Sequence, residues 1–326
     1  MVDAPETGSP ESPARTFPVP TSVSPEAQQF LSMPAFGSAE YPELDDVPGW
    51  VAYVEQADAG LLMAMELRNA GANVTVAELS VDGVPVFDVT PEGAPNGADD
   101  PIYYDIHGGA LVMGAGPGCR AMAIGNAAGT RMHTLAVDYR MPPRHPYPAA
   151  LDDCLVVYRS LLEDHAPETI VVGGGSAGGN LAAALMLRAR DEGLPMPAAL
   201  VLMTPEVDLT ESGDSFQTNL GVDAVLTRSL MPANLLYAGG HDLTDPYVSP
   251  LFGDFTADFP PTFLQSGTRD LFLSNTVRMH RKLRAAGVDA ELHVFEAMPH
   301  GGFFGAPEDR ESSEEVRRFI AAHLKP

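Results

Sequence analysis

Three side chains in this sequence are of the types that together transfer an acyl group: Ser176, Asp270 and His300. A serine hydroxyl is a poor nucleophile until a neighbouring base removes its proton. An imidazole can take and return that proton near neutral pH. A carboxylate fixes the tautomer of the ring and stabilises its charged form. The three residues therefore suggest nucleophilic catalysis, provided that the fold brings them together.

The serine lies in a distinctive local context, the stretch Thr169 to Asn180. An apolar run, 170–172, is typical of a strand buried on both faces, and strong helix-forming residues follow Asn180. Between them lies the pattern Gly174-x-Ser176-x-Gly178, which predicts a sharp strand-to-helix turn that raises the hydroxyl above a sheet. Side chains at the two glycines would collide with neighbouring backbone. The alternative is a glycine-rich turn that only closes a β-α unit.

The acid and the base also follow predicted strands. Asp270 comes after the strand 261–265, and His300 after the strand 290–295, so all three candidates lie at carboxyl ends of strands, where sites of open α/β sheets gather. The chain order Ser, Asp, His fits a hydrolase built on such a sheet. The competing residues are better explained as strand, surface or turn-capping residues: His293, His241, His280, His323, Asp208, Asp245, Asp254 and Asp258.

A fourth motif, His107-Gly108-Gly109-Ala110, follows another predicted strand. Consecutive glycines leave backbone N–H groups free to point into a site. We expect the N–H groups of Gly108, Gly109 and Ala177 to form an oxyanion hole. His107 is interpreted as a residue that braces this loop and not as the base.

The elements that must position these residues alternate between strands and helices. Such alternation predicts a mostly parallel sheet with helices on both faces, and a hairpin at Asp82-Gly83 adds an antiparallel edge. The strands are expected at 74–81, 84–89, 102–106, 134–139, 170–172, 199–203, 261–265 and 290–295. The helices are expected at 119–128, 149–162, 181–190, 274–286 and 308–323.

The segment before the first strand is expected to form a tail and a cap. Residues 1 to about 25 are rich in Pro, Ser and Glu, and two helical patterns follow, from Pro25 to Met33 and from Val51 to Ala70. We therefore divide the chain into 1–70, tail and cap helices, and 71–326, the catalytic domain, with a cap insertion at about 209–240 whose pattern is helical and irregular. Four cap residues either line the pocket or form the core of the cap: Leu31, Met33, Phe36 and Trp50.

Composition narrows the possible partners. The 326 residues include 44 acidic and 19 basic ones, giving a net charge of −25, which disfavours binding to nucleic acid and to anionic membranes. The two cysteines, Cys119 and Cys154, are expected to be reduced structural thiols. No apolar run approaches the length of a membrane span, and the N-terminus lacks the pattern of a signal peptide, so a cytoplasmic location is expected.

From about residue 75 to 324 the chain resembles the hormone-sensitive-lipase-like family, the bacterial family IV carboxylesterases of the α/β-hydrolase fold. The resemblance rests on motifs that agree in order. They are His-Gly-Gly-Ala at 107–110, Asp138-Tyr139-Arg140 with Pro143, His145-Pro146, Pro148-Ala149-Ala150 and Asp152-Asp153, the serine motif at 174–180, Asp245-Pro246-Tyr247-Val248-Ser249-Pro250, and Met298-Pro299-His300-Gly301.

The resemblance implies an eight-stranded sheet with a helical cap, no cofactor or metal, and transfer of an acyl group from a small ester to water. A homodimer is common among such proteins. Three departures bear on substrate range: Gly175 replaces an Asp or Thr, Ala110 replaces a third Gly, and Glu206 replaces a bulky or apolar residue. If Glu206 lines the pocket, it should disfavour anionic acyl groups.

The expected function is a serine carboxylesterase for short- to medium-chain esters. The first alternative is a lactone hydrolase that opens cyclic esters with the same triad. Two further alternatives are an amide hydrolase and a binding protein on a hydrolase scaffold. The plant gibberellin receptor resembles this family but lacks the catalytic histidine, whereas His300 is present here.

Overall fold

The computed structural model describes residues 16–35, 39–97 and 99–324. Within them, eight strands form one sheet in the spatial order β1-β2-β4-β3-β5-β6-β7-β8. The pairs β1–β2 and β2–β4 are antiparallel, and every later pair is parallel. The strands are β1 (Val74–Val81), β2 (Val84–Pro91), β3 (Ile102–Ile106), β4 (His133–Val137), β5 (Ile170–Gly175), β6 (Ala199–Met203), β7 (Thr262–Gly267) and β8 (Ala290–Phe295).

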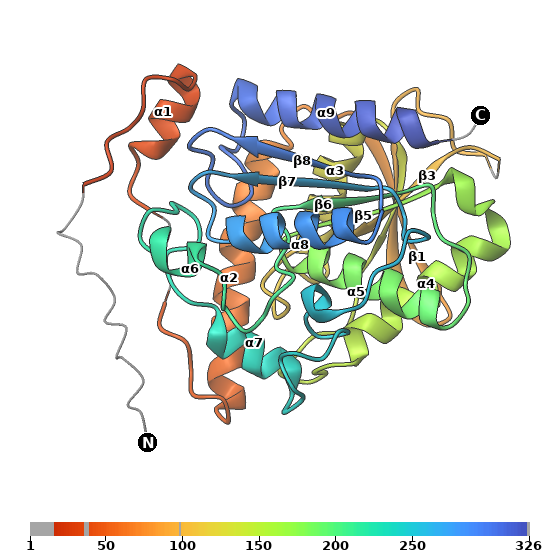
Figure 1. Ribbon diagram of the computed structural model, residues 1–326, viewed down its shortest axis with the longest axis horizontal. Helices are drawn as coiled ribbons and strands as arrows, with labels where there is room; N and C mark the ends of the chain where they lie inside the picture. The colour runs from red at the N-terminus through yellow and green to blue at the C-terminus, as the bar shows by residue number, and fades with distance from the viewer. Residues whose placement is uncertain (1–15, 36–38, 98, 325–326) are drawn as a thin grey trace.

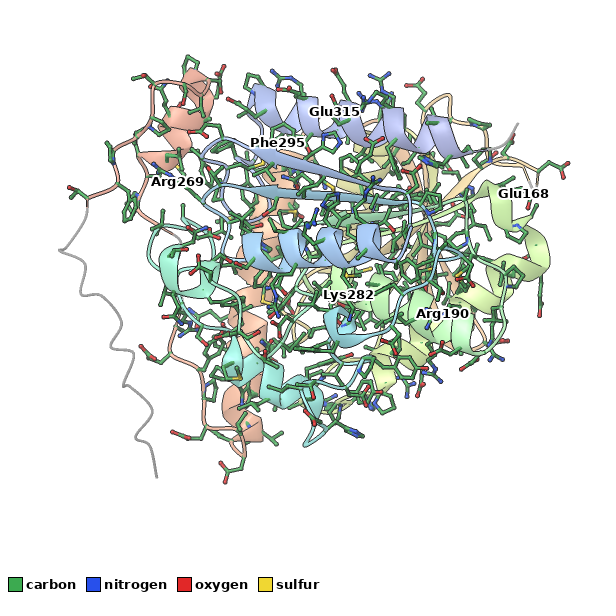
Figure 2. All side chains as sticks on the ribbon, viewed as in Figure 1. Glu168, Arg190, Arg269, Lys282, Phe295 and Glu315 are labelled. Carbon is green, nitrogen blue, oxygen red and sulfur yellow. The ribbon has the colours of Figure 1, made fainter. Side chains whose placement is uncertain are left out.

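Helices cover both faces of this sheet (Figure 1). The α-helices are α1 (Pro25–Leu31), α2 (Val47–Arg68), α3 (Pro117–Thr130), α4 (Ala149–Asp164), α5 (Ala177–Asp191), α6 (Ser215–Thr218), α7 (Met231–Ala238), α8 (Leu273–Ala285) and α9 (Pro307–His323). Helices α3 and α9 pack on one face, and α4, α5 and α8 pack on the other. Figure 2 shows the two layers through Glu315 on α9 and Lys282 on α8, which lie on opposite sides of the sheet.

Alternation along the parallel strands assigns their side chains to these layers. On β3, Tyr104 and Ile106 join the larger core under α4, α5 and α8, whereas Tyr103 joins the core under α9. Strand β5 is buried along both faces, as its run of Ile and Val predicts. The predicted fold class, a mostly parallel sheet of eight strands with helices on both faces, is confirmed.

The segments outside the β-α repeat gather at the end toward which β7 and β8 point (Figure 1). Helix α2 begins four residues before the predicted start, at Val47, because the side chain of Asp46 accepts a hydrogen bond from Gly49 N (3.0 Å) and caps the first turn. The segment 209–240 is only partly helical. It contains only the short helices α6 and α7, and the chain between them, 219–230, is irregular.

Polar contacts join the N-terminal segment to the loop after β7 and to α9. Arg269 lies beside it (Figure 2) and donates a hydrogen bond to Pro18 O at 2.8 Å. Ser24, the N-cap of α1, donates from its backbone and its hydroxyl to the carboxylate of Glu308 on α9, both at 2.7 Å. The predicted tail residues 1–15 lie outside the described residues.

The two cysteines are unbonded and buried, as expected. Burial raises the pKa of both thiols, so they remain protonated. Among the helices of the described residues, none combines the length and the apolar character needed to cross a bilayer.

We expect Ser24→Ala to loosen α1, because it removes both the cap of the helix and one hydrogen bond to Glu308. Loss of such a cap weakens a helix by about 1 kcal/mol, so the amides of α1 should exchange with solvent about fivefold faster. Hydrogen-exchange mass spectrometry measures this. Ser32→Ala, at the exposed other end of the helix, is the control, and equal exchange rates in the two variants would contradict the prediction.

Candidate active site

The turn around Ser176 has the sharp geometry predicted for it. Strand β5 ends at Gly175, α5 begins at Ala177, and Ser176 between them has a φ of +57°, which is strained for a residue with a side chain. Its N–H donates to Met203 O (2.9 Å), and its carbonyl accepts from Glu206 N (3.1 Å). These bonds to the chain after β6 hold the backbone of the serine in place.

The glycines that flank the serine are required by close backbone approaches. A Cβ atom at Gly174 would lie 2.3 Å from Gly178 O, and one at Gly178 would lie 1.9 Å from Ile106 O. Gly175 differs, because a Cβ atom there would meet nothing closer than Met203 O at 3.6 Å. The first two glycines therefore allow the turn, whereas a side chain at the third would make only ordinary van der Waals contacts with Met203.

His300 and Asp270 meet although 30 residues separate them. The Nδ1 atom of His300 lies 3.1 Å from Asp270 Oδ1, and their side chains are 8% and 0% exposed. The carboxylate also accepts hydrogen bonds from Ser266 Oγ (2.6 Å) and from Phe272 N (2.9 Å), which fix its orientation. Burial by itself lowers the pKa of His300, but the hydrogen bond and charge of Asp270 and the charge of Asp223 outweigh it and raise the pKa.

The glycine loop after β3 packs directly against the serine turn. A Cβ atom at Gly108 would lie 2.9 Å from Gly175 O and 3.4 Å from the Cβ of Ser176. Among the described residues, no acceptor bonds the N–H of Gly108 or of Gly109. The N–H of Ala177, as the first in its helix, has no intrahelical partner. These are the three donors that the sequence predicts for an oxyanion hole.

His107 braces this loop, as interpreted from the sequence. Its Nδ1 lies 2.8 Å from Gly108 O, and its ring stacks on Tyr139 with the centroids 4.0 Å apart. Burial lowers the pKa of His107 to about 4, so the ring is neutral and is not poised as a base near neutral pH.

His107, Cys119 and Asp138 also bring three possible metal-ligand atoms within 4.8 Å of one another. Two of these side chains are already engaged, since Cys119 Sγ donates to Val137 O (3.5 Å) and Asp138 Oδ1 accepts from Gly116 N (2.9 Å). A zinc-type site requires a deprotonated thiol, but burial raises the pKa of the Cys119 thiol and keeps it protonated. We assign the cluster to support of the loop.

Ser176, His300, Gly108 and Gly109 all line one cavity of about 670 Å³. The described residues form no hydrogen bond between Ser176 Oγ and the ring of His300; in unliganded enzymes this contact is often long and shortens in the substrate complex. The opposite wall comes from the N-terminal segment and from the irregular chain after α6. Its residues are Tyr41, Tyr53, Gln56, Ala57, Gly60, Leu61, Ala64, Met65, Arg68, Val225, Leu226, Thr227, Arg228 and Leu230.

Of the four residues expected either to line the pocket or to form the core of the cap, the described ones do not line the cavity. Trp50 is fully buried against Tyr41 and Tyr53, whereas Met33 is 49% exposed. Leu31 packs against the cluster around Phe30, and Phe36 falls outside the described residues. The apolar pattern of the first helix and the segment after it indicated burial, but it could not distinguish packing within the cap from contact with the cavity.

Glu206 is buried, but it is not among the residues that line the cavity. Burial raises its pKa to about 8, so the carboxyl is largely neutral at pH 7. The expectation that Glu206 disfavours anionic acyl groups required this side chain to line the pocket, and that condition is not met.

Asp223, which the sequence did not single out, is a second buried carboxylate beside His300. Its Oδ2 accepts from Leu271 N (2.8 Å), its Oδ1 accepts from Val225 N (2.8 Å), and both oxygens lie 3.3 Å from His300 N. One side chain thus joins the loop of the acid, the loop of the histidine and the cavity wall. Burial and the charge of Asp270 raise the pKa of Asp223 to about 6.

Comparison with known proteins agrees with this geometry. A family model described as the alpha/beta hydrolase fold matches residues 103–304. An esterase of Acinetobacter venetianus is 34% identical over 227 residues, which cover 68% of this chain and 75% of that protein. This chain belongs to the hormone-sensitive-lipase-like α/β-hydrolases.

Other members of the α/β-hydrolase family match over similar or greater lengths. An acetyl-hydrolase of Streptomyces hygroscopicus is 33% identical over 67% of this chain and 76% of its own length. The crystal structure of an esterase, E25, is 37% identical and superposes with a TM-score of 0.89 over 97% of this chain and 99% of that one. An esterase from the bacterial hormone-sensitive lipase family superposes with a TM-score of 0.75 at 31% identity, over 88% of this chain and all of that one (100%).

We expect Asp223→Asn to lower the pKa of His300, because the charge of Asp223 is one of the interactions that raise it. An NMR titration of the ring protons of His300, assigned from the spectrum of His300→Ala, measures this pKa. Asp214→Asn is the control, since Asp214 is an exposed acid of the same segment, 209–240. An unchanged or raised pKa in the Asp223 variant would show that its charge does not act on the ring.

Proposed function

We propose that this protein hydrolyses carboxylic esters through Ser176, His300 and Asp270, as a serine carboxylesterase. Its relatives include proteins named as esterases and an acetyl-hydrolase. The observation that carries the residue assignment is the cavity itself. Ser176, held at a φ of +57° between β5 and α5, lines the same cavity as His300. The Nδ1 atom of His300 is hydrogen bonded to the buried carboxylate of Asp270.

In the first step, Ser176 Oγ attacks the ester carbonyl while His300 Nε2 takes the hydroxyl proton. Asp270 keeps the remaining ring N–H on Nδ1 and stabilises the imidazolium that forms. The proton then passes from Nε2 to the oxygen of the departing alcohol. This step leaves an acyl group on the serine.

The negative charge that develops on the carbonyl oxygen is bound by the N–H groups of Gly108, Gly109 and Ala177. Each such donor contributes on the order of 10²–10³ in rate because it is already oriented before the charge appears. The N-terminus of α5 points at the same place and adds a favourable dipole. In the second half of the reaction, His300 activates a water molecule that hydrolyses the acyl-enzyme.

We expect Ser176→Ala to lower kcat for p-nitrophenyl butyrate about 10⁴- to 10⁶-fold, because the nucleophile is removed while the oxyanion donors remain. Steady-state kinetics with the purified variant measure this. Ser160→Ala, on α4, is the control for the substitution and for handling. Activity of the Ser176 variant near that of the control would contradict the assignment.

We further propose that residues 1–70 and about 209–240 act as a cap over the catalytic domain of residues 71–326. The support is that α2 and the chain after α6 supply the cavity wall opposite Ser176. A cap that closes the cavity limits the length of acyl chain that fits. Two other expectations, a homodimer and a cytoplasmic location, stay predictions; light scattering of the purified protein tests the first.

We expect kcat/KM for a series of p-nitrophenyl esters to peak at short or medium acyl chains, because the cap limits the cavity to about 670 Å³. Kinetics from acetate to palmitate measure the profile. Measurements with ε-lactones beside linear esters of matched size test the lactone-hydrolase alternative. A maximum at the longest chains would contradict a limiting cap.

A further inference from the structure

Strand β5 lacks side chains where it passes under α3 and α9. Residues paired across neighbouring strands share a face of the sheet, as do residues two apart on one strand. Gly175 is paired with Met203 on β6, which is paired with Gln265 on β7. Gly173 is paired with Asp105 on β3, so Tyr103, two residues earlier, lies on the same face. Two residues earlier on their strands, Val171, Val201 and Phe263 pack on this same face against α9. Near Ser176, where the two glycines supply no side chain, the active-site cavity extends as a hollow over this face, and the Tyr103 side chain covers Gly173.

We call this hollow the polar chamber and define it by the cavity-lining residues Tyr103, Asn126, Gly175, Met203, Gln265 and Ser312. They come from four neighbouring strands and from α3 and α9, and they adjoin Ser176 through Gly175. The chamber is therefore the part of the active-site cavity that lies between the sheet and its two helices. It is distinct from the wall formed by α2 and the chain after α6.

The hydroxyl of Tyr103, a residue that lines the chamber, is a hydrogen-bond donor without a partner among the described residues. The residue is 4% exposed, and within the described residues its hydroxyl makes no hydrogen bond. A Cβ atom at Gly173 would lie 1.8 Å from Tyr103 Oη, so the hydroxyl occupies the space that this glycine leaves. Burial raises the pKa of Tyr103 well above its usual value, which keeps the proton on the oxygen.

Two further groups of the chamber are incompletely satisfied. Gln265, 3% exposed, donates from Nε2 to Ser266 O (3.2 Å) and contacts Met298 Sδ (3.1 Å), and its Oε1 has no donor among the described residues. The buried Ser312 Oγ likewise has no partner there. Asn126 is held in place by its bond to Asp105 Oδ1 at 2.9 Å. Buried polar groups are normally paired, and leaving them unpaired is costly, so this cluster is suited to a ligand that pairs with them.

We propose that the polar chamber binds an uncharged polar substituent of the ester substrate, a keto or hydroxyl group. A keto oxygen would accept from the Tyr103 hydroxyl, and a hydroxyl could in addition donate to Gln265 Oε1. The chamber residues themselves are uncharged. Among the described residues, the arginines that line the cavity, Arg68 and Arg228, belong to α2 and to the chain after α6. Asp309 lies on α9 one turn from Ser312, and its carboxylate already accepts from the N–H groups of Phe303, Gly305 and Ala306.

This inference rests on the proposed esterase function, and its test separates the two. The substrates are p-nitrophenyl 4-oxopentanoate, 5-oxohexanoate and 6-oxoheptanoate, each compared with the unsubstituted ester of the same chain length. The measured quantity is the ratio of kcat/KM for the oxo ester to that for its unsubstituted partner. A second arm compares the acetate ester of 4-hydroxy-2-butanone with butyl acetate, which places the keto group on the alcohol side.

We expect at least one oxo ester to be preferred over its partner, and Tyr103→Phe to reduce that ratio about three- to tenfold, the usual effect of losing one hydrogen bond. The arm in which the ratio falls identifies the side of the ester that enters the chamber. Tyr237→Phe is the matched control, because the buried Tyr237 hydroxyl likewise has no partner among the described residues and does not line the cavity, so the ratio should stay unchanged.

Phenylalanine preserves the ring of Tyr103, and no hydrogen bond to its hydroxyl is lost within the described fold, so the variant should remain folded; a thermal melt checks this. Equal ratios in the parent and in Tyr103→Phe, in both arms, would overturn the proposal while leaving the esterase function intact. Failure to hydrolyse any of the esters would instead contradict the proposed function.

Discussion

The site depends on the close approach of two backbones. The turn that carries Ser176 crosses the end of β3 so tightly that a side chain at Gly178 would lie within 1.9 Å of Ile106 O. This crossing forces the strained φ of the serine and places Gly108 directly beside it. One packing constraint therefore positions both the proposed nucleophile and the proposed oxyanion donors.

Two buried carboxylates determine the electrostatic environment of His300. The overall charge of −25 lies mostly on the surface, but two carboxylates, Asp270 and Asp223, are buried beside the imidazole. Burial works against a charged ring and the two acids work in its favour, so the pKa of His300 reflects their balance. Because Asp223 also binds the backbone of Val225, the cavity wall and the acid–base pair are mechanically connected.

Much of this architecture could be predicted from local sequence. Apolar runs and glycine signals gave strands and helices close to the observed ones, and the chemistry of a glycine-flanked serine after a buried strand pointed to the turn at Ser176. The less accurate predictions concern the cap. Helix α2 starts earlier because Asp46 caps it, and the segment 209–240 is mostly irregular because its structure is set by contacts and not by periodicity.

The features that sequence reasoning missed depend on contacts between distant segments. Asp223 meets Leu271 and His300 across 48 and 77 residues, and no motif marks it. The polar chamber likewise forms only when four strands and two helices assemble. In the sequence, Tyr103 and Gln265 look like ordinary strand residues, so no local pattern predicts the chamber. Residue type left open whether Trp50 and Glu206 line the pocket, and the structure buries both side chains without placing either among the residues that line the cavity.

The central claim is that Ser176 is the nucleophile activated by His300. Mass spectrometry after reaction with an organophosphate ester tests it most directly. We predict one adduct per chain, located on Ser176, and a large loss of labelling rate in His300→Ala, because the hydroxyl then lacks its base. Stoichiometric labelling at another residue, or labelling of Ser176 at the same rate without His300, would contradict this mechanism.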